Sequence, residues 1–195
     1  SNILLFAGYR FTLAGILVIL IQSILKKKII IPQKNDMKPI LVLAFFQTFG
    51  QYLFYYIGLS KTSGVNAAII TGTGALITLL FSVYIFKSEI LTRNKFLGCL
   101  IGFIGIICIN FTKSVNVSLT GDGLVLCSQF CYSLSACFIH RFSKEHDSVL
   151  LSGYQFLTGG IALILIALIM GASLSFTGVK IYFVLLYLGI ISAVA

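Results

Sequence analysis

Long apolar runs, separated by short polar segments, make up nearly the whole chain. Most runs are close to twenty residues long and carry almost no charge. A helix of roughly 20 residues crosses a bilayer core about 30 Å thick, so this pattern predicts membrane-spanning helices. No polar segment is long enough for a soluble domain, and we predict seven spans: 3–25, 39–60, 65–87, 96–112, 121–139, 148–170 and a shorter run at 181–195.

Charge is scarce and unevenly distributed. Only 10% of the residues are charged, against about a quarter in average soluble domains, and 58% are hydrophobic. The formal net charge of +9 does not indicate nucleic-acid binding, because the basic residues lie in short connections between predicted spans. Those at Lys26–Lys28 are expected to contact membrane lipid headgroups.

The basic residues also predict the orientation of the spans. Ten lie in the connections 26–38, 87–95 and 140–148, whereas the alternate connections hold only Lys61, Lys113 and Lys180. Cytoplasmic loops are enriched in lysine and arginine. We therefore expect these three loops to be cytoplasmic in a multi-pass protein of a bacterial cytoplasmic membrane, with the first span running inward.

One stretch of sequence occurs twice. Residues 5–21 (LFAGYRFTLAGILVILI) align with residues 150–166 (LLSGYQFLTGGIALILI) at an offset of 145 positions. Both copies contain Gly-Tyr-x-Phe followed by Gly-Ile at the same spacing, and Arg10 becomes Gln155. The offset moves five predicted spans along the chain, so the copies have opposite orientations. This arrangement predicts inverted repeats, with most of the first in 1–113 and the start of the second in 114–195.

Four segments resemble the EamA-type permeases of the drug/metabolite transporter superfamily. They are YRF-x-x-AG (9–15), GLSKTSGVNAAIITG (58–72), FKSEILT with the following LGCLIGFIGIICIN (86–110), and TGDGLVLCSQFCYSLSACFIHR (120–141). The resemblance implies an all-α, polytopic membrane helix bundle of two inverted five-helix repeats. This chain is similar to helices two to eight of ten, which predicts that it is truncated at both ends. It departs from the family pattern in lacking the frequent fourth-helix proline and sixth-helix tryptophan.

A secondary transporter of small organic metabolites, such as amino acids or drug-like compounds, is the function that the resemblance implies. It would work as a permease or exporter by alternating access between the repeats. The alternative is a seven-helix receptor or a retinal-type protein, which the visible span count suggests. No paired carboxylates or Ser-His arrangement lies within the spans, so no catalytic residue is predicted and we expect no enzyme.

Arg10 is the one charged residue predicted well inside a span. Burying a charge at membrane depth is costly, and the second copy has no cation in this helix. We expect Arg10 to meet a substrate carboxylate or phosphate, or an acid in an unseen helix, although interfacial snorkelling and pairing with carbonyls are alternatives.

Polar side chains within the apolar spans are further candidates for a substrate pathway. Span 121–139 carries a polar arc, span 39–60 a stripe at i, i+4 and i+8, and span 65–87 a pair at i, i+7. Interhelical hydrogen bonding is the structural alternative for each. The complete set of predicted pathway residues is Arg10, Gln47, Gln51, Tyr55, Asn66, Thr73, Gln129, Tyr132 and Ser133.

Small residues and cysteines within the spans are assigned to packing. Gly98, Gly102 and Gly105 form a seam expected to allow close approach of another helix. The five cysteines lie in apolar runs without histidine or carboxylate partners, so no metal and no cofactor are predicted.

Overall fold

The computed structural model describes residues 2–28, 31–110, 118–172, 184 and 187–189. This part of the chain is helical and contains no strand. Within the described residues, five helical stretches are long and apolar enough to cross a membrane: Ile3–Leu25, Lys34–Leu59, Gly64–Ile85, Leu119–Phe142 and Ser148–Ile169. The prediction of a polytopic helical membrane bundle is confirmed.

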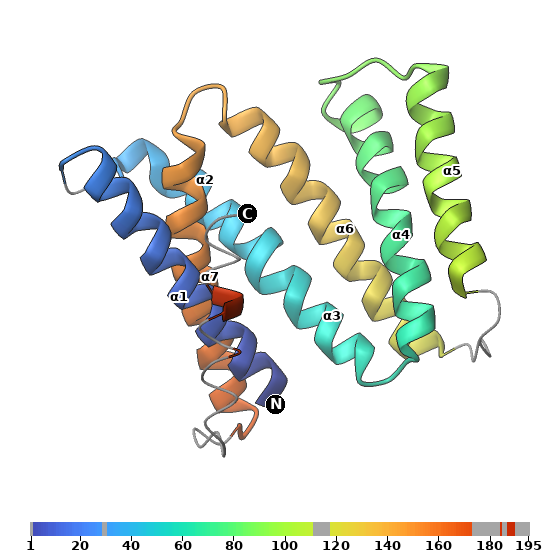
Figure 1. Ribbon diagram of the computed structural model, residues 1–195, viewed down its shortest axis with the longest axis horizontal. Coiled ribbons are helices and arrows are strands. Elements are labelled where there is room, and N and C mark those ends of the chain that lie inside the picture. Colours follow the sequence, from blue (N-terminus) through green and yellow to red (C-terminus); the bar gives the residue numbers. More distant parts are fainter. Residues whose placement is uncertain (1, 29–30, 111–117, 173–183, 185–186, 190–195) are drawn as a thin grey trace. The chain divides into compact units, whose positions relative to one another are not determined.

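The helices follow the predicted spans closely (Figure 1). The predicted run at 181–195 falls mostly outside the described residues. The elements in chain order are α1 (Asn2–Leu25), α2 (Lys34–Leu43), the π-helix η1 (Ala44–Gly50), α3 (Gln51–Leu59), α4 (Gly64–Leu80), the π-helix η2 (Phe81–Ile85), α5 (Arg93–Asn110), α6 (Leu119–Phe142) and α7 (Ser148–Ile169).

Polar side chains explain several helix ends. Gln33 and Asp36 form a capping box, in which the Gln33 amide donates to Asp36 Oδ2 at 2.8 Å, so α2 begins at Lys34 and not at the predicted residue 39. Asp147 caps α7 by accepting from the amides of Val149 and Leu150 at 3.0 and 3.3 Å. Gly171, at φ +76°, ends α7 in the left-handed conformation that glycine adopts most easily.

The described helices form two compact units. The first consists of residues 1–49 and 139–195, and the second of residues 50–138. Both boundaries fall inside helical segments, at the end of η1 and within α6. The units are defined by packing and not by sequence similarity, so the predicted repeats 1–113 and 114–195 stay a prediction.

In the first unit, α1 and α7 cross closely through the duplicated glycines. A Cβ added at Gly15 would lie 2.7 Å from the Gly153 carbonyl oxygen, and one at Gly8 would lie 3.0 Å from the Gly160 carbonyl oxygen. Only glycine leaves room for this approach, because the nearest atoms include helix backbone. Figure 1 shows the two helices side by side.

The contacts at this crossing repeat when each residue is exchanged for its copy 145 positions away. Gly8 meets Ile164 and Gly153 meets Ile19, while Gly15 meets the Leu157 amide and Gly160 meets the Thr12 amide. The rings of Phe11 and Phe156, which occupy the same position in the two copies, stack on each other with centroids 5.6 Å apart. Such reciprocal contacts are those of a two-fold interface, here between two segments of one chain.

In the second unit, α6 packs against α3 and α4. A Cβ at Gly58 would lie 2.9 Å from the Gly121 carbonyl oxygen, and Ser133 on α6 donates to the Gly74 carbonyl of α4 at 3.2 Å. Among the described residues, the predicted glycine seam of α5 does not bring another helix close. No atom lies within 4 Å of a Cβ built at Gly98, Gly102 or Gly105, so the predicted packing is not found in the described part of the chain.

Candidate functional site

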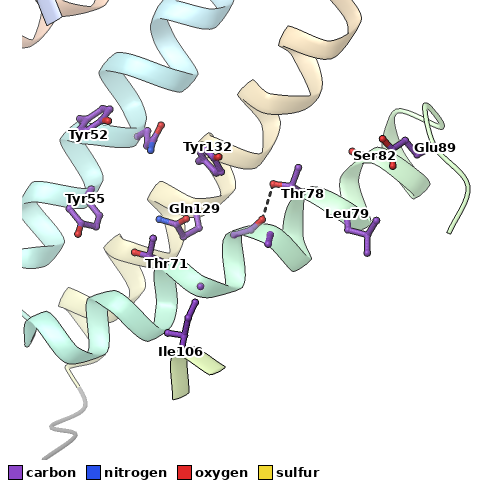
Figure 2. A pocket seen from close by; sticks show the side chains of 14 residues that line it. Tyr52, Tyr55, Thr71, Thr78, Leu79, Ser82, Glu89, Ile106, Gln129 and Tyr132 are labelled. Atoms are coloured by element: carbon purple, nitrogen blue, oxygen red, sulfur yellow. Dashed lines mark hydrogen bonds between the residues drawn. The ribbon is translucent and has the colours of Figure 1, made fainter. Parts of the chain in front are cut away.

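A cavity of about 740 Å³ lies within the second unit. This volume falls in the range of small-molecule sites, roughly 300–1,000 Å³. Its wall is mostly apolar in area but includes many polar side chains, as Figure 2 shows. The lining residues are Gln51, Tyr52 and Tyr55 of α3; Thr71, Gly72, Gly74, Ala75, Thr78 and Leu79 of α4; Ser82 and Glu89 after it; Ile106 of α5; and Gln129 and Tyr132 of α6.

Glycine at position 74 makes room for the Gln129 side chain in the cavity wall. A Cβ there would lie 2.6 Å from Gln129 Oε1, so the amide group occupies the space beside the Gly74 α-carbon. The Gln129 amide nitrogen donates to Ser128 Oγ at 3.1 Å, which turns its oxygen toward α4. Thr78 Oγ1 donates to the Gly74 carbonyl at 2.8 Å, the dashed line in Figure 2.

Four predicted pathway residues line the cavity: Gln51, Tyr55, Gln129 and Tyr132. Tyr132 is 42% exposed, whereas Gln129 is nearly buried. These residues come from two predicted spans, and the fold of the second unit brings them to one cavity.

Three predicted residues of the second unit contact protein instead. Ser133 is fully buried, with its hydroxyl 3.0 Å from Thr78 Oγ1 as well as bonded to Gly74. Thr73 Oγ1 donates to the Ile70 carbonyl at 2.6 Å. Asn66 lies beside Asp122, with Nδ2 3.3 Å from Oδ2. None of the three is among the described lining residues.

Arg10 and Gln47 belong to the first unit. The Arg10 guanidinium lies over the Phe11 ring, 4.3 Å from its centroid, a cation–π contact between neighbours on α1. Gln47 is in η1. The predicted anionic partner of Arg10 stays a prediction.

Sequence analysis missed the contribution of α4. Thr71, Ala75 and Thr78 of α4 follow one another at i, i+4 and i+7, which is the spacing of one helix face, and Ser82 follows in η2. They all line the cavity together with Gly74. A stripe of small and hydroxyl-bearing residues in an otherwise aliphatic helix is the signal that could have identified this face.

Asp122 joins the turn between α3 and α4 to the start of α6. Its carboxylate accepts hydrogen bonds from the Thr62 hydroxyl, the Asn66 amide and the Ser118 backbone amide. The Gly121 α-carbon packs beside the Lys61 carbonyl, where a Cβ would come within 2.7 Å. This end of the second unit is therefore fixed by a polar network with little free space.

A second polar network holds the predicted cytoplasmic ends of the first unit together. Asp147 forms an ion pair with Lys26 and accepts from Gln22 Nε2 at 3.0 Å. The hydrogen bond from Lys26 lowers the pKa of the Asp147 carboxyl, burial opposes this, and the capping amides lower it further. His146 Nδ1 lies 2.6 Å from Asp36 Oδ1, which connects the α6–α7 turn to α2.

Metal ligands are not grouped in this structure. Within the described ranges, no three His, Cys, Asp or Glu side chains lie close enough to hold a metal ion. The chemistry of the cavity is therefore that of hydrogen bonding, aromatic contact and one carboxylate.

Comparison with known proteins relates this chain to transporters. The model of the EamA-like transporter family matches residues 1–111 and again residues 119–195. The "Uncharacterized transporter YyaM" of Bacillus subtilis (strain 168) is 28% identical over 184 residues, covering 90% of this chain and 59% of the relative. An "Uncharacterized transporter" of Methanothermobacter thermautotrophicus is 31% identical over 144 residues, covering 71% of this chain and 42% of the relative.

A solved crystal structure shares the fold, with a TM-score of 0.79 at 20% identity. The match covers 96% of this chain and 65% of the other. The chain thus spans about three fifths or less of the two curated relatives and about two thirds of the solved structure.

Proposed function

Because the chain belongs to the EamA-like transporter family, we propose that it forms part of a secondary transporter of small organic solutes. The cavity among α3, α4, α5 and α6 is proposed as a section of the solute pathway. The observation that carries this proposal is that four polar residues chosen from the sequence for a pathway line one cavity of ligand size.

Alternating access between inverted repeats is the mechanism that we propose. The reciprocal contacts of α1 and α7 support it, because two copies of one sequence that cross antiparallel through equivalent residues have opposite orientations across a membrane. Transporters of this type place the solute between repeats and expose it alternately to each side. The charge distribution supports a topology with loops 26–38, 87–95 and 140–148 in the cytoplasm.

We propose that transport is not driven by nucleotide hydrolysis. No Gly-rich phosphate loop occurs in the sequence. The carboxylate in the cavity wall, Glu89, pairs with Lys95 at 2.9 Å. Solute exchange or facilitated movement needs no further group from this chain.

A matched pair of substitutions on α4 tests whether the cavity carries solute. Thr71 and Ala68 are both exposed and lie three residues apart, but only Thr71 lines the cavity. The protein, with whatever residues flank the chain, would be produced in cells whose solute content is compared with control cells by mass spectrometry. Thr71→Phe is expected to abolish the change in cellular solute content that the wild type produces, because the ring fills the cavity. Ala68→Phe should preserve this change.

Membrane abundance of both variants must match the wild type for this comparison. Equal loss of activity in Thr71→Phe and Ala68→Phe would contradict the placement of the pathway. If the wild type changed the distribution of no solute, the transporter proposal itself would fail.

A further inference from the structure

The cavity wall differs in charge from the chain as a whole, which is basic. The chain has 14 basic and five acidic residues, yet among the described lining residues there is one carboxylate, Glu89, and no lysine, arginine or histidine. Nothing in this part of the wall would neutralise an anionic solute. Removing an anion from water without a cationic partner is strongly unfavourable.

Two hydroxyl groups in the wall donate their hydrogens to the protein itself. Thr71 Oγ1 donates to the Ala67 carbonyl at 2.7 Å, and Thr78 Oγ1 donates to the Gly74 carbonyl at 2.8 Å. A hydroxyl has a single hydrogen to donate, so what these threonines can offer to a solute is oxygen lone pairs. The Gln129 side-chain nitrogen donates one of its two hydrogens to Ser128 Oγ, and its oxygen faces α4. These three side chains therefore present oxygen acceptors to a solute.

Aromatic rings add a second kind of electron-rich surface. Tyr52 and Tyr55 of α3 and Tyr132 of α6 all line the cavity, and Figure 2 labels the three side chains on these two helices. The face of a tyrosine ring attracts cations, with a gain of about 0.5–2 kcal/mol that grows as water is excluded.

We propose that the cavity selects organic cations, such as primary ammonium compounds with an apolar body. This inference rests on the proposed function and specifies the solute class for the same cavity. An ammonium group would donate to the threonine and amide oxygens and lie against the tyrosine faces. Its apolar body would contact Leu79, Ile106 and Ala75.

Glu89 and Lys95 allow a test of whether negative charge in the cavity wall favours cation binding. Their ion pair at 2.9 Å partly neutralises the one carboxylate of the wall, and both side chains are about half exposed. Lys95 is not among the described lining residues, so its removal should make the electrostatic potential near Glu89 more negative without changing the shape of the cavity. Glu89→Gln should weaken cation binding and Lys95→Gln should strengthen it, each by about two- to fivefold.

Three probes with the same phenethyl body separate charge from shape. Phenethylammonium is a cation at neutral pH, 2-phenylethanol is neutral, and 3-phenylpropionate is an anion. Binding of each to the purified protein in lipid nanodiscs would be measured by calorimetry, which avoids the free diffusion of amines across membranes. We expect phenethylammonium to bind at least about tenfold more tightly than either other probe.

Tyrosine variants with a matched control locate the binding. Tyr132→Leu should weaken phenethylammonium binding by roughly 3- to 30-fold, whereas Tyr132→Phe keeps the ring face and should remain within about threefold of wild type. Tyr84 is 67% exposed in the same unit and does not line the cavity, so Tyr84→Leu should leave binding unchanged. Tyr55→Leu serves as a second variant, and thermal stability without ligand identifies any variant that is misfolded.

Tightest binding of 3-phenylpropionate, or equal binding of all three probes, would overturn the inference. It would also fall if Tyr132→Leu and Tyr84→Leu bound phenethylammonium equally. None of these results affects the comparison of Thr71→Phe with Ala68→Phe, so the solute class and the pathway can fail separately.

Discussion

Replacing Gly15 by alanine should separate the crossing of α1 and α7. The new Cβ would lie 2.6 Å from the Leu157 amide nitrogen and 2.7 Å from the Gly153 carbonyl oxygen. Both are backbone atoms of a helix, so no side-chain rotation relieves the contact. The helices would have to move apart by about 0.8 Å to reach an ordinary contact of 3.4 Å.

The expected loss of stability can be estimated from this geometry. Overpacking a well-packed interior costs about 1–3 kcal/mol, and a backbone contact belongs at the upper end. Alanine recovers up to about 1 kcal/mol through its higher helix propensity. The net loss is about 2 kcal/mol, which lowers the melting temperature of a chain of this size by roughly 4–8 °C.

Gly102 supplies the matched control for this substitution. It lies within α5 with no atom within 4 Å of its added Cβ, so Gly102→Ala should leave stability unchanged or raise it slightly. Gly160→Ala, the equivalent change in the second copy, should resemble Gly15→Ala because its Cβ would lie 2.7 Å from the Thr12 amide. Thermal unfolding of the purified protein in detergent would be followed by size-exclusion fluorescence. Equal melting temperatures for Gly15→Ala and Gly102→Ala would refute the close crossing.

Two further predictions concern the polar ends of the helices. The Lys26 hydrogen bond and the capping amides lower the pKa of Asp147, so its contribution to stability is present above its ordinary pKa and is lost as pH falls through the lowered value. Asp147→Asn should therefore lower unfolding free energy by about 0.5–1 kcal/mol at pH 7 and by less at pH 3, and equal effects at both would contradict this. In a variant without native cysteines, Lys28→Cys should be shielded from an impermeant thiol reagent in intact cells and Ser60→Cys labelled. Labelling at both positions would contradict the proposed topology.

The helices could be predicted from the sequence because membrane crossing imposes a length and an apolar composition that the chain shows directly. The π-helical segments η1 and η2 could not. Each inserts wider turns into a run of apolar residues, and nothing in the hydrophobic pattern marks where that happens. The predicted span 39–60 begins at Pro39, whereas the Gln33–Asp36 capping box begins the helix at Lys34, five residues earlier.

The same irregularity explains why the candidate stripe of Gln47, Gln51 and Tyr55 is only partly found at the cavity. Its spacing assumes a regular α-helix, in which residues at i, i+4 and i+8 share a face. Residues 44–50 are π-helical and include Gln47, whereas Gln51 and Tyr55 follow this segment within α3. Only the latter two line the cavity.

For the polar arc of α6, sequence periodicity identified a face that avoids lipid but not which neighbour each residue meets. Ser133 and Gln129 lie one turn apart, yet the Ser133 hydroxyl is bonded to α4 and Gln129 lines the cavity. The difference depends on the position of Gly74. Its lack of a side chain leaves space for the Gln129 amide, and its carbonyl accepts the hydrogen bond from Ser133. Such pairing between helices cannot be derived from the periodicity of either helix alone.

The two-fold contact of α1 and α7 also gives a physical reason for the difference between Arg10 and Gln155. Phe11 and Phe156 stack at the centre of the crossing. Arg10 precedes Phe11 and Gln155 precedes Phe156 by one position, which is about 1.5 Å along each helix. Two arginines there would lie on the order of 10–15 Å apart and repel by about 1–2 kcal/mol at an effective dielectric constant of 20. Gln155 is only 1% exposed, so a charge at that position would also lose its hydration, at several kcal/mol. Arg10, which is half-buried and lies over the Phe11 ring, is the position of the pair where a charge is less costly. These costs give a physical reason for the uncharged residue at this position of the second copy, and that reason does not require that Arg10 bind a substrate.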